Sequence, residues 1–395
     1  MGVCDSKACT AQHVEAASIE EEGKYEYAAQ EPHEELDTLS PRERARKLLA
    51  EGTVRLLSAT WLMAQGEEYI IQRQQELPKE AFLAPADAAE LFGKMFGVVA
   101  LSYGWLSQFH PDPEGFHMHY LHRYLDKHLK RFNRLTDVGV FWDFAALPQC
   151  DLEGNDRTAQ EEHLWQRGLR SLSALFGSTH TVVLQLTKVP EETQPLSDDE
   201  QFYRSAYLLR GWCFFECTVA ALLKDADQLL DLGCAIQELE DDGADWDQVQ
   251  ERARGSRLPP LTPEDMTSEL ANRQFTNGDD IHYLSQTYTE FFEEAAGAAT
   301  WLLFENNTTC DGWGDEELRQ FVRALPFFTK CQAIRLWGHR TLSEEALGEL
   351  RALLPDLKTL GRMLLPKHLE STPEGKAVKS FWASCGKMPG ALIWC

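Results

Sequence analysis

Trp212 and Glu216 lie four residues apart in a stretch, residues 203–223, whose apolar spacing predicts a helix. Side chains four residues apart share one face of a helix, so an indole ring and a carboxylate would point into the same cleft. A carboxylate beside a cleft can stabilise a cationic transition state, such as the ribosyl oxocarbenium ion that forms when a glycosidic bond breaks. This spacing makes Glu216 a candidate catalytic residue, and Tyr103 and Trp105 could stack on the ring of a ligand.

The same helix also allows a structural interpretation. Trp212 could pack with Phe214 and Phe215 in the core, and Glu216 could form an ion pair with Arg210. The helix would then belong to a scaffold without catalytic activity. Both interpretations remain open at the level of the sequence.

Strands and helices alternate along the part of the chain that must position these side chains. The predicted strands are 98–103, 138–144 and 181–186, and the predicted helices are 116–132, 158–176 and 203–223. This alternation indicates a parallel sheet covered on both faces, in which ligands bind beyond the C-terminal ends of the strands. Tyr103 and Asp143 lie at two such ends.

Four landmarks occur in order between residues 95 and 225. They are Ala100-Leu101-Ser102-Tyr103, Val140-Phe141-Trp142-Asp143, Thr181-Val182-Val183-Leu184 and Arg210-Gly211-Trp212-Cys213-Phe214-Phe215-Glu216. In this order they resemble the Toll/interleukin receptor (TIR) domain, whose helix carries a Trp-x-x-x-Glu motif. A fuller pattern adds Trp105-Leu106, His110-Pro111-Asp112-Pro113 and Leu147-Pro148-Gln149 to these landmarks. With these residues the chain is similar to TIR-like families of protists and algae. In those families a Phe-Thr-Asn-Gly segment, here at 275–278, and leucine-rich repeats often follow.

The resemblance implies a flavodoxin-like fold and two functions known for the family, the assembly of signalling complexes and the hydrolysis of NAD. We expect a TIR-like signalling protein that associates with itself or with other TIR-like proteins. The alternative is an NAD glycohydrolase that forms nicotinamide and ADP-ribose or its cyclic form. In that enzyme Glu216 would be catalytic, and NAD would be a substrate rather than a permanently bound cofactor. The residues around NAD would be Tyr103, Trp105, Asp143 and Trp212.

Composition and motifs divide the chain into six segments. A capping box, Ser40-Pro41-Arg42-Glu43, predicts the start of a helix, and Arg323-Ala324-Leu325 recurs at residue 351, an offset typical of leucine-rich repeats. The expected fold is therefore α/β, with a flavodoxin-like parallel sheet, a helical N-terminal flank and a small repeat-like C-terminal region. The expected segments are an acidic tail at 1–39, a helical flank at 40–93, the TIR-like domain at 94–225, an acidic linker with a helix at 226–300, the repeat-like region at 301–366 and a C-terminal tail at 367–395.

The N-terminal residues fit the pattern for N-myristoylation, in which Gly2 carries the acyl chain. One myristoyl chain gives marginal membrane binding, so a second signal is needed, and Cys4 is a candidate for palmitoylation. Residues 1–39 hold ten acidic residues and two lysines, so they cannot supply a basic membrane-binding patch. We expect a cytoplasmic protein that its lipid holds at the cytoplasmic face of a membrane.

Composition argues against several other classes of protein. The chain has 63 acidic and 38 basic residues and a formal charge of -25, which argues against binding to nucleic acid. No uncharged apolar run reaches the length of about 18 residues that a membrane-spanning helix requires. The ten cysteines form no Cys-x-x-Cys pair, so the usual signature of zinc ribbons and thioredoxin chemistry is missing.

Five histidines and two cysteines could have either a chemical role, in metal binding or redox reactions, or a structural one. The histidines, which fall within nineteen residues, are His110, His117, His119, His122 and His128. They could bind zinc or copper, but surface positions on an amphipathic helix explain them as well. Cys213 and Cys217 could be a redox pair or small buried apolar groups. We favour the structural interpretation in both cases and expect no metal site.

Overall fold

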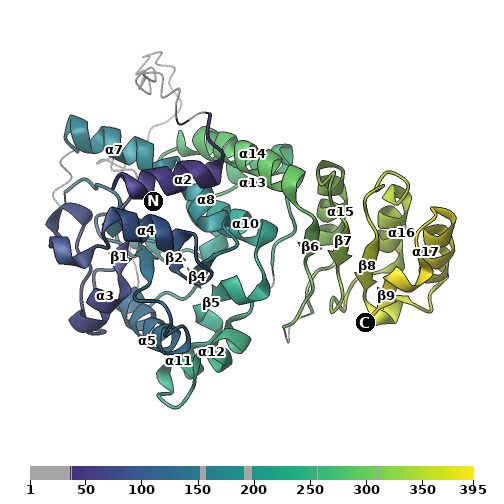
Figure 1. The fold of residues 1–395 in the computed structure, drawn as a ribbon, viewed down its shortest axis with the longest axis horizontal. Coiled ribbons are helices and arrows are strands. Elements are labelled where there is room, and N and C mark those ends of the chain that lie inside the picture. The colour runs from purple at the N-terminus through teal and green to yellow at the C-terminus, as the bar shows by residue number, and fades with distance from the viewer. Residues whose placement is uncertain (1–35, 37, 152–156, 191–197, 256, 309–310) are drawn as a thin grey trace.

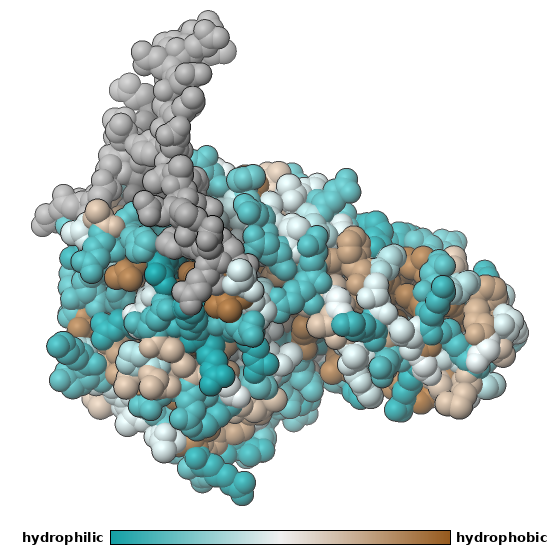
Figure 2. Space-filling view, turned by 45° about the horizontal axis from the view of Figure 1, so that its top comes forward, coloured by the Kyte–Doolittle hydropathy of each residue, from teal (hydrophilic) through white to brown (hydrophobic). Residues whose placement is uncertain are grey.

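The computed structural model contains two β-sheets with helices packed around them (Figure 1). It describes residues 36, 38–151, 157–190, 198–255, 257–308 and 311–395. Gly2 and Cys4, the predicted acylation sites, lie outside the described residues. The first sheet forms the body of the molecule, and the second forms a narrower arm that projects from it (Figures 1 and 2).

Four parallel strands form the centre of the first sheet. They are β2 (Val98–Tyr103), β3 (Gly139–Phe141), β4 (Thr181–Leu186) and β5 (Leu229–Asp231). A fifth strand, β1 (Leu57–Ser58), pairs antiparallel with β3, and the order is β1-β3-β2-β4-β5. The prediction of an α/β chain is confirmed. The sheet is mixed rather than parallel, because the N-terminal flank supplies β1 in addition to its helices.

Helices cover both faces of the first sheet. Val98 and Ala100 of β2 point into one core, and Val99 and Leu101 point into the other, because side chains alternate along a strand. The first core contains side chains of α2 (Pro41–Ala50), α4 (Pro85–Phe92), α7 (Ala159–Leu169), α8 (Leu172–Gly177), α10 (Gly211–Leu223), α13 (Pro263–Ala271) and α14 (Asp280–Ala298). The second contains side chains of α3 (Ala59–Gln65), α5 (Phe116–Arg131), α11 (Ile236–Glu240) and α12 (Trp246–Ala253).

The limits of several elements differ from those that the sequence predicts. Helix α2 begins as predicted, since the Ser40 hydroxyl accepts from the Glu43 amide and the Glu43 carboxylate accepts from the Ser40 amide. The helix predicted over 158–176 is two helices, α7 and α8. The strand predicted over 138–144 is shorter, because Asp143 already begins the short helix α6 (Asp143–Ala146). Another short helix, α9 (Asp198–Tyr203), precedes α10.

The arm is a parallel array of four strands. They are β6 (Trp301–Leu303), β7 (Ala333–Arg335), β8 (Arg362–Leu365) and β9 (Leu392–Trp394), and they alternate with α15 (Asp315–Ala324), α16 (Glu344–Leu353) and α17 (Pro373–Ser384). Buried residues that pair in register, Leu302, Ile334, Met363 and Leu392, follow one another at intervals of 32, 29 and 29 residues. The array continues through residues 367–395, where we expected a tail, because Trp382 and Trp394 are buried in the same core.

Arg257 joins the body to the arm. Its guanidinium donates hydrogen bonds to the carbonyl of Ala221, near the end of α10, and to the carbonyl of Leu303 on β6. Its own carbonyl accepts a hydrogen bond from the indole Nε1 of Trp313 at 2.6 Å. Because Arg257 is buried, water could not easily replace the guanidinium as the hydrogen-bond donor to the carbonyls of Ala221 and Leu303.

Lys224 is a second buried cation near the end of α10. Its Nζ donates to the carbonyl of Thr181 at 2.6 Å and to the carbonyl of Ser178, which directly follows α8. The Lys224 residue is 0% exposed, and burial lowers its pKa. The carbonyl of Ser178 lies at the C-terminal end of α8, where helix carbonyls carry partial negative charge. Its hydrogen bond offsets part of the free-energy cost of burying the Lys224 ammonium group.

Replacing Arg257 by methionine preserves much of the side-chain volume and removes both donors. We expect Arg257→Met to lower the free energy of unfolding by about 2–4 kcal/mol, because buried carbonyls lose a charged donor. Urea denaturation measures this change. The control is Arg252→Met at an exposed position of α12, which should change stability by less than about 0.5 kcal/mol. Equal losses in the two variants would show that Arg257 does not hold the junction.

Candidate functional site

Glu216 lies inside the molecule, on a helix that is buried nearly all round. Twelve of the thirteen residues of α10 are buried, and Glu216 is 5% exposed. Its Oε2 accepts a hydrogen bond from the Ser102 hydroxyl at 2.6 Å, and Ser102 Oγ lies 2.5 Å from the Tyr207 hydroxyl. Since Ser102 gives its only proton to Glu216, Tyr207 must donate to Ser102. These three side chains, the Glu216 network, link the helical turn η3 (Tyr207–Leu209) through β2 to α10.

The Glu216 network carries no net charge at neutral pH. Burial raises the pKa of Glu216 to about 8, the nearby Asp143 carboxylate acts in the same direction, and the hydrogen bond from Ser102 opposes the rise. Burial also raises the pKa of Tyr207 well above its ordinary value. The Glu216 carboxyl group is therefore mostly protonated at pH 7. In this form it is a hydrogen-bonding group and not the anion that would stabilise a ribosyl cation.

Tyr103 and Asp143 contact each other at the ends of neighbouring strands. The Tyr103 hydroxyl donates to Asp143 Oδ1, which also accepts from the Phe144 amide at 2.8 Å. The Tyr103 ring packs edge-on against Trp142 and His117, with centroid distances of 5.8 Å and 5.3 Å. Tyr103 is 5% exposed, so rings of the protein already occupy the sides on which a ligand would stack.

Trp105 and Arg210 meet just beyond the end of β2. The Trp105 carbonyl accepts from Arg210 Nη1 at 2.9 Å, and the carbonyls of Tyr203 and Ser205 accept from the same guanidinium. Arg210 therefore does not pair with Glu216. The Trp105 ring is buried, and its Nε1 has no hydrogen-bond partner among the described residues.

Trp212 contacts a different part of the molecule from Glu216. Its Nε1 donates to Asp280 Oδ2 at 2.7 Å, and its ring centroid lies 6.4 Å from that of Tyr283. The expectation that Trp212 and Glu216 line one cleft is not met. The first turn of α10 packs against α14, whereas Glu216, one turn later, contacts β2. Burial raises the pKa of Asp280 to about 6, and the Trp212 hydrogen bond opposes this rise.

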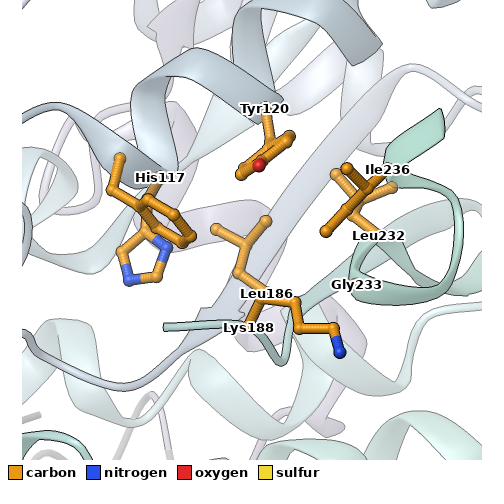
Figure 3. A pocket seen from close by; sticks show the side chains of 8 residues that line it. His117, Tyr120, Leu186, Lys188, Leu232, Gly233 and Ile236 are labelled. Carbon is orange, nitrogen blue, oxygen red and sulfur yellow. The ribbon is translucent and has the colours of Figure 1, made fainter. Parts of the chain in front are cut away.

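A small hollow lies where α5 meets the C-terminal ends of β4 and β5 (Figure 3). The residues that line it are Phe116, His117, Tyr120, Leu186, Lys188, Leu232, Gly233 and Ile236. Its enclosed volume of about 10 Å³ is far below the range of roughly 300–1,000 Å³ that is usual for small-molecule sites. None of the predicted site residues lines this hollow.

The polar side chains that hold Glu216 and Trp212, namely Ser102, Tyr207 and Asp280, are absent from the predicted site. Ser102 belongs to the Ser-Tyr landmark, from which the prediction takes only the tyrosine as a site residue. Tyr207 comes five residues before the first residue of the Trp-x-x-x-Glu motif. A usable signal does exist. Ser102 stands in an otherwise apolar strand and Glu216 in an otherwise apolar helix, and buried polar groups must find partners.

The predicted histidine cluster is split between the interior and the surface. His117 and His128 are buried, and burial lowers the pKa of His128 to about 4. His119 by contrast lies 2.7 Å from a carboxylate oxygen of Glu240 near the surface. In the part of the chain that the structure describes, no three histidine, cysteine, aspartate or glutamate side chains come together as a metal-binding group.

Cys213 and Cys217 are buried free thiols. Burial raises the pKa of both to about 12, so they are uncharged at pH 7. Cys217 Sγ accepts a hydrogen bond from Gln185 Nε2 at 3.0 Å. Both cysteines act as small buried groups on α10, which agrees with the structural interpretation.

Glu216→Gln should remove a pH dependence from the stability of the protein. The carboxyl group has a pKa of about 8 in the folded chain and of about 4.3 in an unfolded chain. Between these values the folded chain holds the extra proton, so the free energy of unfolding falls as the pH rises, by up to about 1.4 kcal/mol per pH unit. Glutamine has no proton to lose, so the variant should lack this decline in urea denaturation series from pH 5 to pH 9.

The control for this series is Glu80→Gln, which changes an exposed glutamate in the same way. It should keep the decline of the parent protein. Identical pH profiles for the parent and Glu216→Gln would show that Glu216 titrates normally and is not held in its protonated form.

Comparison of this chain with models of protein families, with curated proteins and with solved structures finds no match. The chemistry available at the C-terminal ends of β2 and β3 is therefore what the described side chains provide. It consists of a protonated carboxyl group hydrogen-bonded to Ser102, whose hydroxyl also contacts Tyr207, beside a tyrosine–aspartate contact.

Proposed function

We propose that this chain is a TIR-like signalling protein that acts by assembly, with copies of itself or with other TIR-like proteins. The observation that carries this proposal is the enclosure of Glu216, which lies 5% exposed in a hydrogen-bonded network instead of beside a cleft. A side chain that satisfies the interior of the fold supports a scaffold better than an enzyme.

The order of the parallel strands supports the TIR-like part of the proposal. Numbered along the chain from β2, the parallel strands lie in the order 2-1-3-4. These are the first four positions of the flavodoxin-like order 2-1-3-4-5. The landmarks also fall where the family would have them, with Tyr103 ending β2, Asp143 directly after the β3 region and Glu216 on α10.

Exposed apolar side chains close to this network offer a surface for assembly. Leu208 and Leu209 are 40% and 46% exposed, and they directly follow Tyr207, which contacts β2 through Ser102. Adjacent exposed apolar side chains that form a patch are typical of protein–protein contact sites. The proposal therefore places a contact surface over η3, on the outer side of the Glu216 network.

NAD hydrolysis is the second candidate function, and one observation favours it. A buried acid with a strongly shifted pKa, close to the C-terminal ends of parallel strands, is typical of functional sites. Nicotinamide leaves NAD as a neutral molecule without needing a general acid, so a single carboxylate near the ribosyl cation would suffice. For that chemistry Glu216 would have to lose its proton, and the ribose hydroxyls would have to replace Ser102 as its hydrogen-bond donor.

Leu208→Glu combined with Leu209→Glu should weaken self-association without unfolding the chain, because both side chains are exposed. We expect the parent to show a mass that rises with concentration in sedimentation equilibrium, and the double variant to remain monomeric. The matched control, Ile70→Glu with Met388→Glu, changes two other exposed apolar residues and should associate like the parent.

The same samples decide between assembly and hydrolysis. Incubation with NAD at the highest concentration, where assemblies form, should release no nicotinamide that depends on Glu216. Release by the parent that Glu216→Gln abolishes would overturn the proposal of a scaffold and establish the hydrolase. A parent that neither associates nor releases nicotinamide would contradict both functions.

We also propose that the N-terminus anchors the protein to a membrane through acyl chains on Gly2 and Cys4. Within the described residues, no helix is long and apolar enough to cross a membrane. The proposal rests on the sequence pattern and on the acidity of the surrounding residues, which makes attachment through basic side chains unfavourable.

Gly2→Ala should release the full-length protein from membranes, because alanine at the second position cannot take the myristoyl chain. Fractionation of eukaryotic cells that express the parent and the variant measures the effect. Cys4→Ser should give a partial release, since one acyl chain alone binds marginally. Identical membrane fractions for parent and Gly2→Ala would rule out the anchor.

A further inference from the structure

The strands of the arm differ in charge from the rest of the chain. Arg335 and Arg362 are the only charged residues in β6 to β9, and no acidic residue occurs in these four strands. Residues 301–395 hold 12 basic and 11 acidic residues, in a chain that has 38 basic and 63 acidic residues overall. The acidic residues on the helices of the arm are Asp315, Glu316, Glu317, Glu344, Glu345, Glu349 and Glu374.

The register of the strands places a row of apolar and basic side chains on one face of this sheet. Leu302, Ile334, Met363 and Leu392 are buried under α15 to α17. The residues one position further along each strand point the other way and pair with one another, because side chains alternate. They are Leu303, Arg335, Leu364 and Ile393, and all four are partly exposed. We call this row and Trp301 with Arg362 the arm face.

Trp301 and Arg335 contact each other on the arm face. Trp301 is 46% exposed, and the Arg335 guanidinium lies 5.6 Å from the centre of its ring. Arg335 also pairs with Glu305, whose side chain is only 9% exposed. Arg335 therefore neutralises the Glu305 carboxylate, which is the acidic group in contact with the arm face. The exposed ring of Trp301 is available as an anchor for a bound partner.

Several basic side chains at the arm face have no acidic partner. Arg362 is exposed, and so are Lys330 and Lys358, which precede β7 and β8. None of these three forms an ion pair within the residues that the structure describes. The N-terminal ends of the arm strands thus carry positive charge that the rest of the molecule leaves unpaired.

We propose that the arm face docks an acidic segment of a partner protein that also carries apolar side chains. The apolar side chains would pack on Leu303, Leu364 and Trp301, and the acidic ones would pair with Arg362, Lys330 and Lys358, which have no acidic partner among the described residues. A nucleic acid would also carry negative charge, but it lacks aliphatic side chains for the apolar row of the arm face. This inference does not depend on the function proposed for the body of the molecule.

A labelled peptide tests the proposal on the full chain. The probe is a short peptide of glutamate, aspartate, leucine and phenylalanine, and fluorescence anisotropy measures its binding. We expect Lys330→Gln with Arg362→Gln, which removes two unpaired charges and leaves the Arg335–Glu305 pair intact, to raise the Kd at least fivefold. The matched control is Lys79→Gln with Lys376→Gln, which removes two exposed charges elsewhere and should leave the Kd within about twofold, since exposed charges away from a site act weakly.

A second variant separates loss of binding from loss of folding. Trp301→Ser changes an exposed side chain, so thermal unfolding should be unchanged while the peptide binds at least threefold more weakly. Equal effects of the two charge pairs, or no effect of either, would overturn the proposal. Tighter binding of a single-stranded oligonucleotide of the same charge, lost with Lys330→Gln and Arg362→Gln, would overturn it in favour of nucleic acid.

Discussion

Helix α10 is enclosed on nearly every side, and this burial constrains the molecule more than any other feature. Twelve of its thirteen residues are buried, so each polar group along it needs a partner inside the protein. Glu216 accepts a hydrogen bond from Ser102 on β2, and Trp212 donates one to Asp280 on α14. The carbonyl of Ala221 accepts one from Arg257. The same helix therefore fixes the sheet, the flanking helix and the arm relative to one another.

This constraint explains why the candidate site is closed. Burial favours the protonated form of a carboxyl group, and the raised pKa of Glu216 expresses this. The nearest arginine in sequence, Arg210, is occupied by backbone carbonyls. The residues of the Trp-x-x-x-Glu pattern can thus hold the fold together, and on this ground we propose assembly rather than turnover.

Local patterns in the sequence predict the main elements well, but not the contacts between them. The apolar runs of β2 and β4 and the capping box of Ser40 are strong local signals, and the structure has these elements. β1 has two residues and β5 has three, which is too short for a pattern, so their membership of the sheet depends on tertiary pairing. The direction of the Trp212 side chain depends in the same way on Asp280, 68 residues further along the chain. The recurring Arg-Ala-Leu motif occurs twice in the arm, at residues 323 and 351. The last strand, β9, carries no such motif and joins the array through its pairing with β8 and its buried side chains.

The burial of Lys224 makes this lysine a chemical reporter of the fold. Its ammonium group is shut off from solvent and held by the carbonyls of Ser178 and Thr181, whereas most lysines of a protein lie in water. An amine-acylating reagent would react with surface lysines within minutes but reach Lys224 only when the end of α10 separates from α8 and β4. The rate at which this single lysine is labelled would therefore give the frequency with which the body of the protein opens, at a point one turn from the junction with the arm.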